Sequence, residues 1–211
     1  MAPNVAPLDR PTRLNKDESS PAKEDLDNCL FRNFREGRDM SLSPNCEEFP
    51  GLSRPSLILD VGTFTGMSAR IFLDFSTDFG GTVHTFDVIP WSSFDSHLNQ
   101  NDFTSKRLFQ HLVDLSVPEI FEKYRALFAA ADLIFCDAPK DGIFEYKLLR
   151  LISNASLPAK ERLLVLDDIR FLNMFPLWRS IDSPKLDATS LGHWSGTGLV
   201  DISEGLSMKE E

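Results

Sequence analysis

From residue 56 onward, short apolar runs alternate with segments whose apolar residues recur every three or four positions. The runs predict strands, and the segments between them predict helices. The predicted strands span residues 57–60, 82–87, 108–113, 133–136 and 163–166. The predicted helices span residues 66–75, 118–130 and 144–152. This alternation is typical of a parallel sheet with helices on both faces.

The two ends of the chain show other patterns. Residues 186–202 contain two apolar runs around a short glycine-bearing loop, which predicts an antiparallel hairpin added at the edge of the sheet. Residues 1–19 are rich in Pro, Asn, Asp and Lys with little periodicity, and we expect a flexible arm there. Ser20 and Pro21 predict the start of a helix that can end at Gly37.

Composition adds limits to this α/β prediction. The chain has 211 residues, 42% hydrophobic and 26% charged, which suits one soluble domain. Its formal net charge of −10 disfavours nucleic acid and anionic membranes as partners. No apolar run approaches the ~20 residues that cross a membrane, and the N-terminus has no secretory pattern. The three cysteines lack metal-binding spacing, and we expect a cytoplasmic protein.

Four predicted strands end in an aspartate, namely Asp60, Asp87, Asp137 and Asp167. In open parallel sheets, ligands bind beyond the carboxyl ends of the strands. Aspartate is a poor strand residue and is costly to bury without a partner. Each of these residues alone could start a turn or cap a helix. Four at one edge favour a polar site for cations or hydroxyl groups.

The run Asp60–Gly66 lies between a predicted strand and a predicted helix, in the form D-x-G-x-x-x-G. Gly62 permits a tight turn and a close approach of the backbone to a ligand. Asp87, at the end of the next strand, can accept hydrogen bonds from both hydroxyls of a ribose. Phe64 stands where the pyrophosphate-binding fingerprint has its middle glycine. The loop therefore favours a nucleoside ligand without a pyrophosphate.

The nine residues 60–68 resemble the first motif of the small metal-dependent O-methyltransferases, a class I group that includes catechol and caffeoyl-CoA O-methyltransferases. The resemblance implies S-adenosylmethionine as cofactor. It implies that Asp60 faces the methionine portion, that Ser68 contacts its carboxylate at a helix start, and that Asp87 holds the ribose. The implied cofactor-binding residues are Asp60, Gly62, Thr63, Phe64, Ser68, Asp87, Val88, Asp114 and Leu115, the last two near the adenine by a looser match.

Residues 137–141 are similar to the D-x-x-K-D run of the same family. The resemblance implies that Asp137 is a Mg²⁺ ligand and that Lys140 is the general base. Asp167 and Asp168 fall where the family has Asp-Asn, as the other two metal ligands. The aspartate in place of asparagine resembles the macrocin-type sugar O-methyltransferases of natural-product pathways. His193, in the loop of the predicted hairpin, is a second candidate for the base.

The resemblance covers roughly residues 56–202 and implies one Rossmann-like methyltransferase domain over residues 56–211. It implies a mostly parallel seven-stranded sheet with a C-terminal antiparallel hairpin, and a helical lid over residues 20–55. The implied partner is a small-molecule acceptor, and we expect a monomer or homodimer.

Methyl transfer from a sulfonium requires an aligned and deprotonated acceptor. A hard dication binds two neighbouring oxygens and lowers their pKa, and Ca²⁺ or Mn²⁺ fits these ligands as Mg²⁺ does. The leading hypothesis is therefore a Mg²⁺-dependent O-methyltransferase for a catechol-like or sugar-diol acceptor.

Other hypotheses use the same residues. Transfer to nitrogen or oxygen could proceed without a metal, or the chain could bind S-adenosylmethionine without catalysis. A nicotinamide oxidoreductase is disfavoured by Phe64. Lys140 is a base near neutral pH only if its pKa is depressed, and it could instead be a solvated loop residue. Asp168 could cap a following helix, and capping is the favoured role for Asp141.

Overall fold

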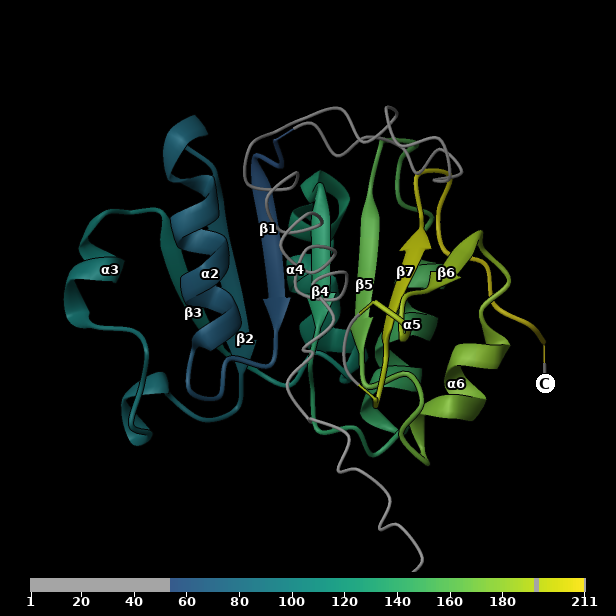
Figure 1. The fold of residues 1–211 in the computed structure, drawn as a ribbon. Helices are drawn as coiled ribbons and strands as arrows, with labels where there is room; N and C mark the ends of the chain where they lie inside the picture. Colours follow the sequence, from purple (N-terminus) through teal and green to yellow (C-terminus); the bar gives the residue numbers. More distant parts are fainter. Residues whose placement is uncertain (1–53, 192–193, 211) are drawn as a thin grey trace, which may run out of the picture.

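The computed structural model describes residues 54–191 and 194–210. These residues build a seven-stranded sheet with the strand order β3-β2-β1-β4-β5-β7-β6 (Figure 1). The strands are β1 (Leu57–Val61), β2 (Thr82–Asp87), β3 (Leu108–Leu112), β4 (Leu133–Cys136), β5 (Leu163–Asp167), β6 (Lys185–Asp187) and β7 (Thr197–Asp201). The predicted arm at 1–19 and almost all of the predicted lid at 20–55 lie outside the described residues.

The sheet is mostly parallel, as predicted. Strands β1 to β5 run parallel to one another, whereas β7 is antiparallel to both β5 and β6. The strand order changes direction between β1 and β4, which pair side by side although two strands separate them in sequence. Ligands in open sheets bind beyond the carboxyl ends of strands at such a switch point.

Helices cover both faces of the sheet, because successive residues of a strand point to opposite sides. Ile58 of β1 packs with Ala69 and Leu73 in one core, whereas its neighbour Leu59 belongs to a second core with Phe128 and Leu149. Figure 1 shows α2 in front of the sheet and α4 and α5 behind it. The helices are α2 (Met67–Phe75), α3 (Gln100–Thr104), α4 (Pro118–Ala130), α5 (Phe144–Asn154) and α6 (Met174–Ser180), with 3-10 turns η2 (Ser76–Phe79) and η3 (Trp91–Ser93).

Two helices and one loop differ from the sequence prediction. Helix α3 was not predicted because it is short, and it is held by a capping box between Asn99 and Asp102. Helix α6 carries Pro176 in its first turn, where the missing N–H costs little, and it buries Trp178. The predicted hairpin is present, but residues 188–196 connect its strands in place of a short loop.

No helix among the described residues has the length and apolar character needed to cross a membrane. The longest of them, α4, is amphipathic and buries Phe121 and Phe128 against the sheet.

Candidate active site

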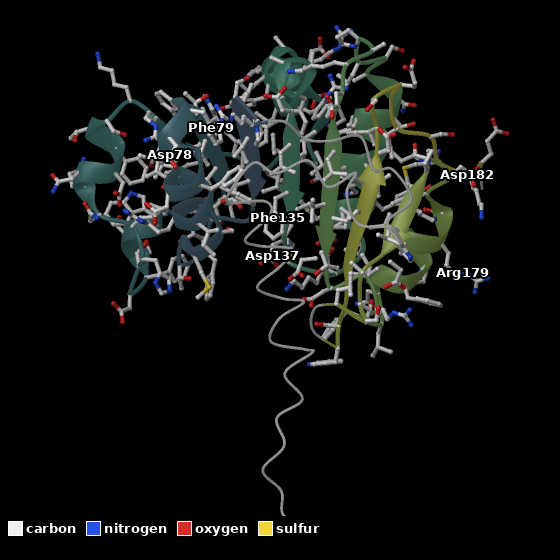
Figure 2. The ribbon with its side chains drawn as sticks, turned by 45° about the horizontal axis from the view of Figure 1, so that its top comes forward. Asp78, Phe79, Phe135, Asp137, Arg179 and Asp182 are labelled. Carbon is white, nitrogen blue, oxygen red and sulfur yellow. The ribbon has the colours of Figure 1, made fainter. Side chains whose placement is uncertain are left out.

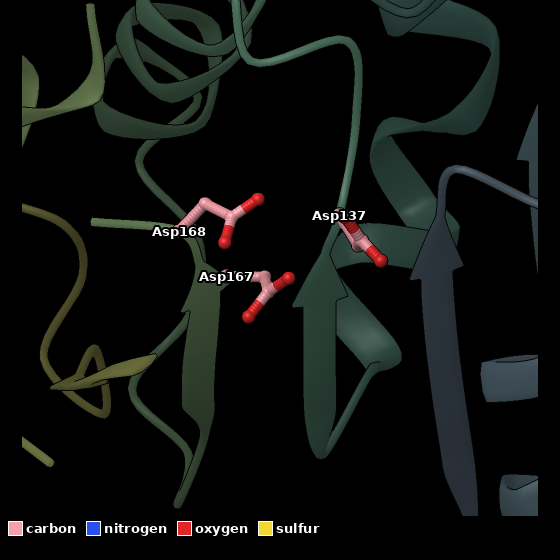
Figure 3. Close-up of side chains that lie close together, drawn as sticks. All are labelled: Asp137, Asp167 and Asp168. Atoms are coloured by element: carbon pink, nitrogen blue, oxygen red, sulfur yellow. The ribbon is translucent and has the colours of Figure 1, made fainter. Parts of the chain in front are cut away.

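Three carboxylates meet at the carboxyl ends of β4 and β5. Asp137 directly follows β4 and Asp167 ends β5, and the preceding residues of the two strands are paired in register. One carboxylate oxygen from each of Asp137, Asp167 and Asp168 lies within 4.8 Å of the others (Figure 3). Figure 2 places Asp137 near the middle of the sheet, close to Phe135 of β4. The three residues expected to bind a metal therefore form one cluster, here called the acid cluster.

Backbone contacts hold Asp168 in its place beside Asp137 and Asp167. Its φ angle is +57°, a conformation that costs a non-glycine residue about 1–2 kcal/mol. Ile169 N–H donates to the Gly196 carbonyl at 3.1 Å, and Arg170 N–H donates to the Ser195 carbonyl at 2.8 Å. The β7 side of the sheet thus holds the segment after Asp168 in place. No helix begins directly after Asp168, since α6 starts at Met174, so the helix-cap alternative is wrong.

Lys140 reaches into the acid cluster. Its Nζ lies 2.8 Å from an Asp137 oxygen and 3.4 Å from an Asp167 oxygen, and it also pairs with Asp168. Burial acts to lower the pKa of Lys140, but the hydrogen bonds to Asp137 and Asp168 outweigh it and raise the pKa above its ordinary value. Lys140 is therefore not a solvated loop residue. With only the three carboxylates around it, Lys140 does not have the depressed pKa that a general base requires.

The loop between β4 and α5, which begins at Asp137, is organised by neighbouring residues. Burial raises the pKa of Asp137, against the effect of its hydrogen bond with Lys140. Asp141 Oδ1 accepts hydrogen bonds from the N–H groups of Ile143 at 2.7 Å and Phe144 at 2.9 Å, so it caps the start of α5 as expected.

The first loop, residues 60–66, packs directly on the residue that begins the acid cluster. Gly62 has a φ of +109°, and an added Cβ would lie 2.0 Å from the Asp137 carbonyl oxygen. The glycine is thus needed for contact between two loops of the protein itself. Phe64 N–H donates to Asp87 Oδ2 at 2.9 Å, and Ile89 N–H donates to Asp87 Oδ1 at 3.0 Å. Asp87 therefore ties the first loop to the end of β2.

Asp60 is fully buried within β1. Its Oδ2 accepts a hydrogen bond from Thr85 Oγ1 at 2.6 Å, and Thr63 Oγ1 lies 2.7 Å from the same hydroxyl. Its Oδ1 has no hydrogen-bond partner among the described residues. Burial raises the pKa of Asp60 to about 7, although the hydroxyl groups of Thr85 and Ser68 act to lower it. An unsatisfied buried oxygen is costly, which suggests a ligand that donates to it.

The remaining residues expected to bind the cofactor lie on three elements. Ser68 is in the first turn of α2, which contains no acidic residue, and no side chain among the described residues caps the N-terminus of this helix. Val88 is exposed after β2, and Asp114 accepts the Ser116 N–H at 2.9 Å. The side chain of Leu115 is buried in the core, which leaves only its backbone for a ligand. Cofactor contacts by this set stay predictions.

One predicted residue, His193, and one residue that was not predicted, Glu145, remain to be placed. His193 lies outside the described residues. Glu145 was not singled out from the sequence, because an acidic residue in the first turn of a helix is common for its effect on the helix dipole alone. In the structure it is buried, and it accepts hydrogen bonds from the Lys140 and Gly142 N–H groups.

No family model matches the chain, and no curated protein matches its sequence. Solved structures do match. The cofactor-bound Rv0187 from MTB is 15% identical with a TM-score of 0.53, covering 90% of this chain and all of that one. The SAH-bound Podospora anserina methyltransferase PaMTH1 is 16% identical with a TM-score of 0.52, covering 96% of this chain and all of that one.

The MycE methyltransferase from the mycinamycin biosynthetic pathway, in complex with Mg, SAH and mycinamycin VI, is 12% identical with a TM-score of 0.50. That match covers 87% of this chain and spans 55% of the MycE chain. At such identities the likeness establishes the fold. The chain has a Rossmann-like methyltransferase fold, as the sequence predicted.

Proposed function

We propose that this protein is an S-adenosylmethionine-dependent O-methyltransferase that uses a divalent cation, with Mg²⁺ as the natural choice. Its acceptor is a small molecule with two neighbouring oxygens, such as a catechol or a sugar diol. The acid cluster beside Lys140, on a fold shared with methyltransferases, carries the proposal. MycE, which has this fold, was crystallised with Mg, SAH and a natural product.

The residues present fit a cation. Asp137, Asp167 and Asp168 supply only carboxylate oxygens, the ligands that Mg²⁺ prefers. Three carboxylates and one ammonium carry a formal charge of −2, which one dication would neutralise. A lone helix cap or a solvent-facing loop needs no such concentration of charge.

The residues also fit the cofactor. Asp60 Oδ1, which has no hydrogen-bond partner within the described part of the chain, offers an acceptor for the ammonium of the methionine portion. The N-terminus of α2, which no described side chain caps and which has Ser68 in its first turn, favours the carboxylate of the same portion. Asp87 keeps lone pairs for ribose hydroxyls beyond the two backbone hydrogen bonds that it accepts.

In the proposed reaction, the acceptor oxygen attacks the sulfonium methyl group, a C–O bond forms and the C–S bond breaks. Lys140 Nζ receives the hydroxyl proton of the acceptor, which requires that Lys140 first be neutral. A dication bound by the acid cluster would lower the pKa of both the acceptor hydroxyl and Lys140.

The test uses the full-length protein with labelled S-adenosylmethionine and a panel of catechols and sugar diols. We expect transfer to stop after dialysis against a chelator and to return with Mg²⁺. Asp168→Ala should weaken the binding of Mn²⁺, measured by calorimetry, by about tenfold or more. Asp78→Asn is the control, because Asp78 is exposed in η2 and lies far from Asp137 (Figure 2). Undiminished transfer without the cation would overturn the metal requirement.

A further inference from the structure

The loop that carries Lys140 has an unusual backbone. Lys140 has a φ of +62° and Gly142 a φ of +73°, so the chain enters the left-handed region twice within three residues. A lysine rarely adopts this region, because its Cβ then crowds the following carbonyl oxygen. Such a conformation persists where surrounding contacts impose it.

Glu145, the second residue of α5, supplies these contacts. Its Oε1 accepts the Lys140 N–H at 2.6 Å, and its Oε2 accepts the Gly142 N–H at 3.1 Å. The residue is 1% exposed, so solvent does not weaken these charge-assisted hydrogen bonds. The other side of the loop is also fixed, because a Cβ added to Gly142 would lie 2.4 Å from the Asn173 carbonyl oxygen.

The direction of the Lys140 side chain follows from this backbone. With its N–H held by Glu145, Lys140 points its Nζ at Asp137, Asp167 and Asp168. Asp141 has a different role in the same loop, since its carboxylate accepts the N–H groups of Ile143 and Phe144 at the start of α5.

The geometry points to Glu145 as a positioning residue, which fixes the Lys140 backbone so that Lys140 Nζ stays at the acid cluster. Its effect on the reaction rests on the proposed function, in which Lys140 receives the proton of the acceptor. The effect of Glu145 on the position of the Lys140 side chain does not depend on that function.

The first experiment is independent of activity. A carbodiimide joins an amine to a carboxylate that touches it, and mass spectrometry measures the Lys140–Asp168 product. The Lys160–Asp132 pair, 2.6 Å apart and remote from this loop, is the standard in the same sample. We expect Glu145→Gln and Glu145→Ala to lower the ratio of the two products by about tenfold, as for loss of a hydrogen bond to a charged group.

A matched control variant is Glu119→Gln, because Glu119 is also the second residue of its helix, α4, but is exposed. It should leave the cross-link ratio unchanged. Amide hydrogen exchange at Lys140 and Gly142 should quicken in the Glu145 variants and not in the control. A ratio that stays at the wild-type value, with or without faster exchange, would overturn the positioning role.

The second experiment measures methyl transfer. Glu145→Gln should lower kcat by about tenfold without changing the KM for S-adenosylmethionine, and it should have no further effect in a Lys140→Ala background. Equal losses in both backgrounds would assign Glu145 a general structural role and overturn the proposal. If the wild-type protein transfers no methyl group at all, the proposed function fails, and the cross-link ratio still decides the role of Glu145.

Discussion

Replacing Gly62 by alanine tests whether the first loop and the acid cluster depend on each other. The new Cβ would lie 2.0 Å from the Asp137 carbonyl oxygen, at a φ of +109°. The conformation costs about 1–2 kcal/mol, and forcing an atom into a packed position costs about 1–3 kcal/mol more. We therefore expect Gly62→Ala to lower the free energy of unfolding by about 2–5 kcal/mol, a large share of the stability of a typical domain.

Gly205→Ala separates the two contributions. Gly205 has a similar φ of +98°, but a Cβ added there meets nothing within 4 Å. It should lose only the conformational part, about 1–2 kcal/mol. Urea unfolding followed by far-UV circular dichroism measures both variants, and calorimetry with Mn²⁺ measures whether displacement of Asp137 weakens ion binding. Equal losses of stability in the two variants would refute the argument that contact with Asp137 requires the glycine.

Three further predictions concern single side chains. Lys140→Ala should lower kcat by about 10²–10⁴-fold with an unchanged Kd for S-adenosylmethionine, and a normal kcat would remove Lys140 as the base. Leu149→Ala, at a fully buried core position, should lower the free energy of unfolding by about 2–5 kcal/mol in urea titrations; a loss below about 1 kcal/mol would contradict its place in the core. The pKa of Asp60 is raised from 3.8 to about 7, so the folded chain binds the extra proton between these values, and the contribution of Asp60 to stability should fall as pH rises through that window. Asp60→Asn should lack that fall in urea titrations across the same range, and parallel curves for the two proteins would show that Asp60 does not titrate this way.

Most regular elements could be predicted from local pattern. Strands β2 and β4 and helix α4 have the predicted bounds, because their apolar spacing is clear and their ends coincide with turn residues or proline. Helices α3 and α6 were not predicted. Each is short, and α6 forms because Met174, Leu177 and Trp178 are buried against the rest of the chain. Such burial has no signature in a local window of sequence.

The acid cluster was predictable for a reason of topology. Neighbouring parallel strands end at one edge of a sheet, so acids that follow β4 and β5 had to lie near each other. The raised pKa of Lys140 was not predictable in the same way. Its pKa depends on how closely three carboxylates approach one ammonium, which is decided by loop conformation.

By itself, the sequence determined the alternation of strands and helices, the acids at the strand ends and the first loop, because these follow from residue type and spacing. The tertiary structure alone decided why Gly62 must be glycine, why one oxygen of Asp60 has no partner among the described residues, and that Glu145 binds the Lys140 N–H. Each of these depends on contact between segments distant along the chain or on backbone angles that non-local packing imposes. Local patterns carry no record of such contacts, and it is these contacts that place the chemistry at one edge of the sheet.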